Sequence, residues 1–306
     1  MDISFYESVI STMLVAGTPL LYSTLGEIYA ERSGVLNLGV EGMMIMGAVT
    51  AFIAGKTTGS LIFAVSAAVL VGIALSLIHA FVSITMRGNQ IVSGLALTMF
   101  GLGLSSVMGI KYIGAPGISF SAIKIPLLSQ IPLLGPIFRR DALFYLSLVL
   151  AVVMWYILFR TKIGVRIRAC GENPAAADAL GVNVSLIRYA CTAIGGGLAG
   201  LGGAYLSTVT APFWVDGMTA GRGWIAVALV IFSFWSPLRA IVGAYLFGGI
   251  EAVQFNLQAY GIPTDVLGMM PYIATIVVMI FSVSETVRKR FGAPAALGIP
   301  FVREER

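Results

Sequence analysis

The longest charge-biased interruption of an otherwise apolar chain, residues 159–188, reads FRTKIGVRIRACGENPAAADALGVNVSLIR. This stretch predicts a short helix over residues 174–180. Asn173 is a favourable N-cap, Pro174 suits the first helical position, and Gly181 suits the residue after the end. The predicted helix has almost only small side chains, so a partner's backbone could approach it closely. The alternative is a loop helix that only lies on the membrane surface.

The composition on both sides of this stretch indicates a membrane protein. Of 306 residues, 58% are hydrophobic and 11% are charged, whereas a soluble protein has about 25% charged residues. Apolar runs of near 20 residues recur, which is the length a helix needs to cross roughly 30 Å of hydrocarbon. The runs are continuous rather than alternating, which excludes barrel strands. We therefore expect an all-α, polytopic transmembrane bundle forming a single domain over residues 1–306.

The apolar runs predict about nine membrane spans. The expected spans are residues 9–27, 35–55, 60–86, 91–110, 142–159, 186–208, 223–234, 240–259 and 266–283. The seventh is too short to cross straight, so it is expected to be re-entrant or shielded by its neighbours. An inner polar loop covers residues 160–185. An outer loop, residues 111–141, contains four prolines and is expected to lie at the interface.

The distribution of Lys and Arg orients these spans. With the inner loop in the cytoplasm, thirteen of the nineteen cations lie inside, among them the cluster Arg288–Arg290. The N-terminus is then outside and the C-terminus is inside. The net charge of +5 follows from this bias and does not indicate a nucleic-acid partner. Cys170 and Cys191 fall on the cytoplasmic side, where we expect no disulfide, and no Cys/His cluster predicts a metal site.

Two candidate pathway residues lie in the second span. Asn37 and Glu41 are four residues apart, which places them on one face if the helix starts at Val35. Glu41 would then lie about 9 Å inside the span, where a carboxylate costs around 2.5–3.5 kcal/mol on insertion scales. Such a residue faces the bundle or a cavity. It either lines the substrate pathway or forms a buried polar clamp between helices.

Two more candidates lie in the eighth span. Glu251 is near its middle and Gln254 follows one turn later, with Gln258 further along, so the three form one polar stripe on an apolar helix. Polar stripes at membrane depth face an aqueous path or a neighbouring helix. We favour the path. A lone histidine, His79, is expected to be a packing residue.

Glycines supply packing rather than nucleotide chemistry. In GGGLAGLGG, residues 195–203, Gly196 and Gly200 have the spacing of close helix contacts, and no strand precedes them. The GKT at residues 55–57 is not a phosphate-binding loop, because the position that needs glycine is Thr50. No nucleophile–base or metal constellation indicates an enzyme. The aromatic loop at Pro212–Asp216 predicts an interfacial anchor, or else a contact with a docking partner.

Two motifs carry a family resemblance. The stretches ERSGVLNLGVEGMMIMGA (residues 31–48) and RACGENPAAADALGV (residues 168–182) resemble permease subunits of bacterial ABC importers for branched-chain amino acids and simple sugars, most of all the nucleoside-type members. The resemblance implies that the inner helix is a coupling helix that docks on an ATPase. The residues carried over to that role are Glu172, Asn173, Pro174, Ala175, Ala176, Ala177, Asp178, Ala179, Leu180 and Gly181.

The same resemblance implies an assembly in the bacterial inner membrane, in contact with membrane lipid. A second, longer permease, a cytoplasmic ABC ATPase and an extracytoplasmic binding protein are the expected partners, and the substrate is a nucleoside. ATP and Mg are expected on the ATPase, with no cofactor in this chain. Two alternatives are a simple-sugar permease of the same architecture and a proton-coupled secondary transporter that uses Glu41 or Glu251.

Overall fold

The computed structural model describes residues 3–258, 262–282 and 292–302. The expected ends of the last two spans, Ala259 and Val283, and the cluster Arg288–Arg290 lie outside this part of the chain. The α-helices are α1 (Ile3–Arg32), α2 (Val40–Thr58), α3 (Leu61–Ala80), α4 (Gln90–Gly109), α5 (Ala142–Arg160), α6 (Lys162–Glu172), α7 (Pro174–Ala179), α8 (Val184–Tyr205), α9 (Arg222–Phe232), α10 (Pro237–Gln258), α11 (Thr264–Gly268) and α12 (Met270–Ser282).

The expectation of an all-α, polytopic bundle is confirmed. Within the described residues, five helices are long and apolar enough to cross a membrane. They are Phe5–Arg32, Leu61–Thr85, Gln90–Tyr112, Ala142–Arg160 and Val184–Thr210, where the second and fifth end in single π-helical turns, η1 (Phe81–Thr85) and η5 (Leu206–Thr210). The seventh expected span is α9, whose 11 residues reach about 16 Å. The total of nine spans stays a prediction.

The first two spans differ from the prediction at their junction. Helix α1 continues past Glu27 to Arg32, and α2 begins only at Val40 instead of Val35. The break between them includes Gly34, whose φ of +96° lies in the left-handed region where a side chain would be strained. The prediction that Asn37 and Glu41 lie on one helical face is therefore wrong, because Asn37 precedes the helix.

Glycine contacts let the central helices cross at very short range. Helices α1 and α8 pack against each other, α1 also packs against α10, and α8 also packs against α3. A Cβ added to Gly196 would collide with the carbonyl oxygen of Gly72, and one added to Gly200 with that of Ala68. A Cβ on Gly248 would lie 2.9 Å from Cα of Gly17. The predicted packing role of Gly196 and Gly200 is thus confirmed.

The packing of the central helices is reciprocal. Helix α3 packs on α8, and α10 packs on α1 in the same way. Helices α1 and α8 therefore each pack between two other helices at the centre of the bundle.

The outer loop is more ordered than its prolines suggest. It contains three 3₁₀ turns, η2 (Ile110–Tyr112), η3 (Leu128–Gln130) and η4 (Gly135–Phe138), and a two-stranded antiparallel pair, β1 (Ile123–Lys124) and β2 (Arg139–Arg140). The same loop covers the aromatic segment after η5. Gly114 donates its N–H to the carbonyl of Trp214 at 3.0 Å. The indole of Trp214 is fully buried, whereas Phe213 beside it is 44% exposed. Trp214 is thus a core residue, and the interfacial anchor expected for this loop stays a prediction.

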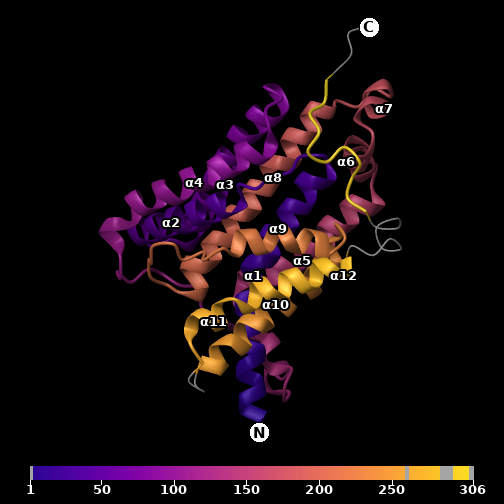
Figure 1. Ribbon diagram of the computed structural model, residues 1–306. Helices are drawn as coiled ribbons and strands as arrows, with labels where there is room; N and C mark the ends of the chain where they lie inside the picture. The colour runs from indigo at the N-terminus through magenta and orange to yellow at the C-terminus, as the bar shows by residue number, and fades with distance from the viewer. Residues whose placement is uncertain (1–2, 259–261, 283–291, 303–306) are drawn as a thin grey trace.

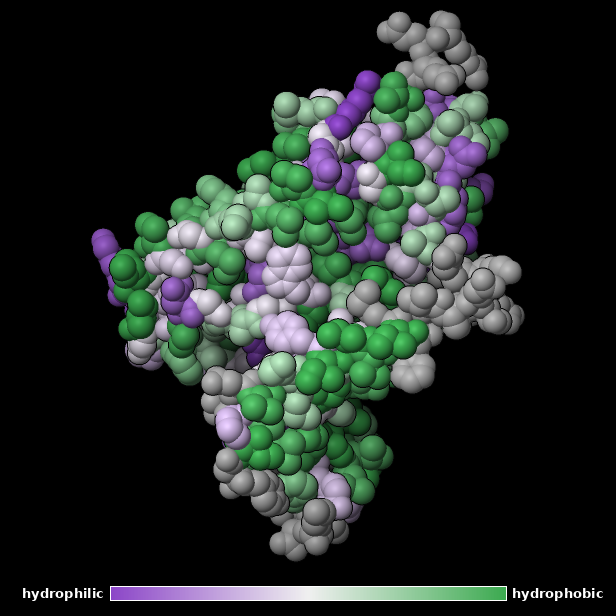
Figure 2. Space-filling view, in the orientation of Figure 1, coloured by the Kyte–Doolittle hydropathy of each residue, from purple (hydrophilic) through white to green (hydrophobic). Residues whose placement is uncertain are grey.

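The two ends of the bundle differ in character. The N-terminus lies at one end, and α6, α7 and the last described residues lie at the other (Figure 1). Hydrophilic residues are frequent around α6 and α7, whereas the body is mostly hydrophobic on the face shown in Figure 2. The predicted orientation needs the N-terminus and α7 to lie at opposite ends, as they do. That the α7 end faces the cytoplasm stays a prediction.

Candidate functional site: a docking end and a buried polar crossing

Helix α7 has the termini that its sequence predicts. The side chain of Asn173 accepts the N–H of Ala176 at 3.0 Å, and Pro174 occupies the first position. The chain leaves the helix through Gly181 at φ +83°, where a non-glycine residue would be strained. Local capping rules therefore suffice to place this helix.

The helix before it, α6, is absent from the sequence-based prediction. Gly164, Ile167 and Cys170 are buried on one face, three residues apart, whereas Lys162 and Arg166 are exposed. That three-residue spacing is the signal that predicts an amphipathic helix. Burial raises the pKa of the Cys170 thiol, and nearby Arg188 acts in the opposite direction. The inner loop thus contains two helices, α6 and α7, which follow each other almost directly in the chain.

The faces of α7 have different surroundings. Ala177 is buried with Cys170, Val184 and the partly buried Phe301, so it packs inside this chain. The expectation that Ala177 contacts a partner directly is therefore wrong. The exposed residues of the helix and its end are Ala175, Ala176, Ala179 and Leu180. Leu180 is 85% exposed.

Arg188 joins three segments beneath α7. Its guanidinium donates to the carbonyl oxygens of Ser33 at 3.1 Å, Ile299 at 3.1 Å and Cys170 at 3.5 Å. The residue is 1% exposed. Because a buried charge without hydrogen bonds is costly, the position of this guanidinium fixes the ends of α1 and α6 and the C-terminal segment relative to one another.

The C-terminal segment, residues 292–302, makes further backbone bonds to the same region. Ala296 donates its N–H to the carbonyl of Gly171 at 2.8 Å, and Gly298 donates to Gly34 at 3.2 Å. This segment therefore connects the end of α6 to the break between α1 and α2.

The second region is centred on Glu41, in the first turn of α2. Its carboxylate accepts hydrogen bonds from the Thr219 hydroxyl at 2.5 Å and from the N–H groups of Gly221 at 2.9 Å and Gly223 at 2.6 Å. These donors lie at the start of α9, where N–H groups lack partners within the helix and the helix dipole favours an anion. Glu41 thus caps α9 and clamps it to α2.

Asn37 lies in the break before α2. Its side chain accepts the N–H of Gly39 at 2.9 Å, and its own N–H donates to Glu27 at 2.9 Å. Asn37 is fully buried and belongs to a turn rather than to the face of Glu41. The structure therefore separates the two residues that the sequence analysis joins.

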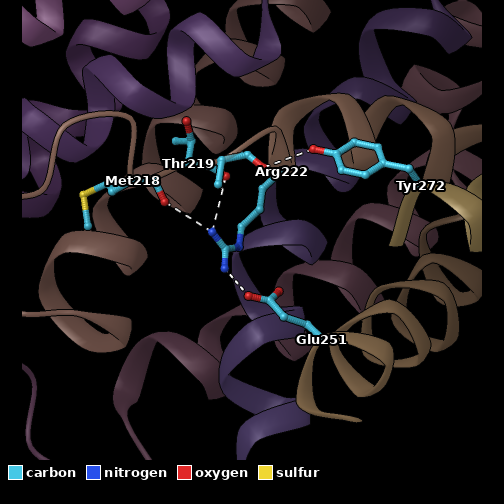
Figure 3. A network of polar contacts seen from close by, with 6 residues as sticks. Met218, Thr219, Arg222, Glu251 and Tyr272 are labelled. Atoms are coloured by element: carbon cyan, nitrogen blue, oxygen red, sulfur yellow. Dashed lines mark hydrogen bonds and ion pairs between the residues drawn. The ribbon is translucent and has the colours of Figure 1, made fainter. Parts of the chain in front are cut away.

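Glu251 pairs with a cation at the start of α9. Arg222, the first residue of α9, forms an ion pair with Glu251 of α10, and each side chain is 15% exposed (Figure 3). Arg222 also donates to the carbonyls of Met218 at 3.2 Å and Thr219 at 3.3 Å. The hydroxyl of Tyr272 on α12 donates to the carbonyl of Ala220 at 3.3 Å. The network connects α9, α10 and α12.

Three further polar residues of α1 and α10 are at least partly buried. Gln254, one turn after Glu251, is partly buried, and its place in the pathway stays a prediction. Glu27 and Glu31, one turn apart on α1, are both buried, and Glu31 accepts the indole N–H of Trp235 at 2.6 Å. Their four-residue spacing at the end of an apolar run is the signal that would have found them. Within the described residues, no group of three or more His, Cys, Asp or Glu could hold a metal ion.

Comparison with known proteins decides what kind of protein has this arrangement. Residues 9–283 match the family described as the permease component of the branched-chain amino acid transport system. The chain belongs to this permease family. The permease is 36% identical to the guanosine ABC transporter permease protein NupQ of Bacillus subtilis, with 97% of each chain covered. It is 33% identical to the nucleoside ABC transporter permease protein NupC of Lactococcus lactis, with the same coverage.

Two further likenesses agree with this assignment. A protein of Haloferax volcanii named as a glucose ABC transporter permease, TsgC13, is 38% identical and covers 98% of the permease and 99% of its own length. A solved structure, described as a metal-chelate type ABC transporter in an inward-facing conformation, has a TM-score of 0.50 and 17% sequence identity. The match covers 90% of the permease and 85% of that chain. This last likeness supports the fold alone.

The expected family and location are therefore confirmed. The permease is an integral protein of the cytoplasmic membrane and a permease subunit of an ABC importer. Membership of an ABC importer family disfavours the alternative of a proton-coupled secondary transporter. Partnership with another permease and an ATPase follows from the family.

Proposed function

We propose that this permease carries a nucleoside across the membrane together with a second, longer permease. A separate cytoplasmic ABC ATPase docks on α7 and hydrolyses ATP, and an extracytoplasmic binding protein delivers the substrate. Two relatives named for guanosine and nucleosides, each similar over nearly the whole length, support the substrate class.

The exposed face of α7 is the observation that carries the coupling role. Leu180 exposes 85% of its surface at the hydrophilic end of the bundle, beside the exposed methyl groups of Ala175, Ala176 and Ala179. A large apolar side chain beside small ones can enter a groove of a partner, where a buried anchor residue contributes much of the binding energy.

The test compares variants on the two faces of α7. Leu180→Asp and Ala176→Trp should reduce ATPase co-purification about tenfold or more, because buried anchors often contribute at least 2 kcal/mol. Thermal stability of the isolated permease should stay unchanged. Ala177→Trp should instead destabilise the permease, since added bulk in a packed core costs typically about 1–3 kcal/mol.

The matched control is Ile163→Asp, an exposed apolar residue of α6 (60% exposed) away from α7. It should leave ATPase binding at the parental level. If Leu180→Asp binds the ATPase and supports uptake as well as the parent, α7 is only a surface connector and the proposed docking role is wrong.

A sugar is the second candidate substrate, because the relative named for glucose is also similar over nearly the whole length. The two candidates separate in vesicles that contain the complete assembly. Guanosine uptake should require ATP, resist an uncoupler and be unaffected by excess glucose. Glucose uptake without guanosine uptake would support the sugar, and uptake that an uncoupler abolishes would contradict an ATP-driven importer.

A further inference from the structure

An apolar groove runs between the end of α3 and the first half of α4. Its walls are Ile78 and Val82 on one side and Val92, Ala96 and Phe100 on the other, and its volume is about 530 Å³. Several wall residues are strongly exposed, with Val92 at 62% and Phe100 at 54%. In the floor, Ser93 bonds to the Nδ1 atom of His79 at 3.0 Å, so His79 is the packing residue that was expected.

The groove meets a cavity of different character at the start of α4. Asn89 borders both, and this second cavity, of about 520 Å³, is lined by Arg87, Gln90, Leu36 and the segment 297–300. It lies at the α7 end of the bundle, because Arg87 also lines a neighbouring cavity with Asp178 and Phe301. The apolar groove and this cavity, hereafter the chamber, therefore adjoin at Asn89, and the chamber is lined by a cation.

Two groups of this chamber have spare hydrogen-bonding capacity. Gln90 is 3% exposed and its Oε1 accepts the N–H of Leu36 at 2.7 Å, but its Nε2 has no partner among the described residues. A buried donor without a partner is costly. Arg87 is exposed, has φ +57° and makes no ion pair within the described part of the chain. Both groups would suit the oxygen atoms of an anion.

We propose that the groove and the chamber together bind one anionic phospholipid. An acyl chain lies in the groove between α3 and α4, the phosphate lies beside Arg87, and the Gln90 amide donates to a phosphate or ester oxygen. The start of α4 adds a favourable helix dipole. A basic pocket between helices at the cytoplasmic membrane surface is suited to an acidic lipid headgroup. A second permease is the competing occupant, but an apolar helix face would leave Arg87 and Gln90 unpaired.

The test is native mass spectrometry of the permease, purified with the other subunits from vesicles of phosphatidylglycerol and phosphatidylethanolamine. The parent should retain one phosphatidylglycerol per permease. Arg87→Gln should lower its occupancy about fivefold, the effect of one cation near an acidic membrane surface. Ala96→Trp should abolish it by filling the groove. Arg166→Gln, an exposed cation on α6, and Met99→Trp, on the membrane-facing side of α4 outside the groove, are the matched controls and should bind as the parent does.

Three outcomes would overturn the site. Equal lipid retention in the parent, Arg87→Gln and Ala96→Trp would show that the lipid lies elsewhere. Equal retention of phosphatidylethanolamine would remove the role of the anion. If Ala96→Trp instead releases the second permease while Met99→Trp does not, the groove is a protein interface. The measurement needs no transport activity, so its result is independent of the proposed substrate.

Discussion

Glu41 and Glu251 are both carboxylates in apolar helices, and the same sequence argument makes both candidates for the substrate pathway. The structure gives them different surroundings. Glu41 is 3% exposed and is held by three donors from the start of α9. The Glu251 side chain is 15% exposed and pairs with Arg222. A buried carboxylate that accepts several hydrogen bonds from a helix end holds two helices in a fixed position. A partly exposed ion pair contributes less to stability and can open.

Removal of the Glu41 carboxylate should have the largest effect. Glu41→Leu leaves three donors without an acceptor, and each buried unsatisfied group costs about 1–3 kcal/mol. We expect a loss of roughly 3 kcal/mol or more, seen as a lower thermal midpoint in detergent, and little uptake. Glu41→Gln keeps one oxygen and should be milder. The partly exposed Glu7 gives the control Glu7→Gln. Equal, complete loss of uptake in both Glu41 variants with normal folding would indicate that the charge itself matters.

The losses of stability caused by changing Arg222 and by changing Glu251 should not be additive. Arg222→Met and Glu251→Leu should each destabilise the permease by about 1–2 kcal/mol, because each leaves one charge partly buried without a partner. The double variant should be destabilised by about 1 kcal/mol less than the sum of the two single variants. Thermal unfolding of the four proteins measures the coupling. Effects that add within about 0.5 kcal/mol would show that the pair contributes little.

Water should reach Glu251 more easily than Glu41. Single cysteines at Glu251 and Gln254 should react with a membrane-impermeant thiol reagent about tenfold faster than one at the buried Met43, next to Glu41. The native thiols, Cys170 and Cys191, are replaced first. Protection of both Glu251→Cys and Gln254→Cys in every transport state would contradict the predicted pathway.

The smallest effect should come from the edge of the Figure 3 network. Tyr272 donates one partly exposed hydrogen bond of 3.3 Å to Ala220, so Tyr272→Phe should change stability by less than about 0.5 kcal/mol. The thermal midpoint measures this. A loss as large as that of Arg222→Met would place Tyr272 at the centre of the network.

Sequence reasoning succeeds where the determinants are local. The cap of Asn173, the first-turn Pro174 and the left-handed Gly181 are neighbours in the chain, and each acts through its own backbone. The close contacts of Gly196 and Gly200 follow from spacing alone. These features can be predicted without knowing which distant residues they contact.

The same reasoning fails where a partner comes from far along the chain. The acceptor role of Glu41 depends on Gly221 and Gly223, about 180 residues later, and no local pattern joins them. The displaced start of α2, by contrast, has a local signal. Ser33-Gly34 and Asn37 through Gly39 contain turn-forming residues that favour a break over a continuous helix.

The contact between Arg188 and Ile299 has a consequence for biogenesis. Residues 292–302 leave the ribosome after every described helix, and chains fold as they emerge. Until the carbonyl of Ile299 arrives, the guanidinium of Arg188 lacks one of its three acceptors, and Phe301 is missing from the cluster beneath α7. We therefore expect a nascent chain to insert its described helices first, and the region beneath α7 to be complete only after residues 292–302 have been synthesised.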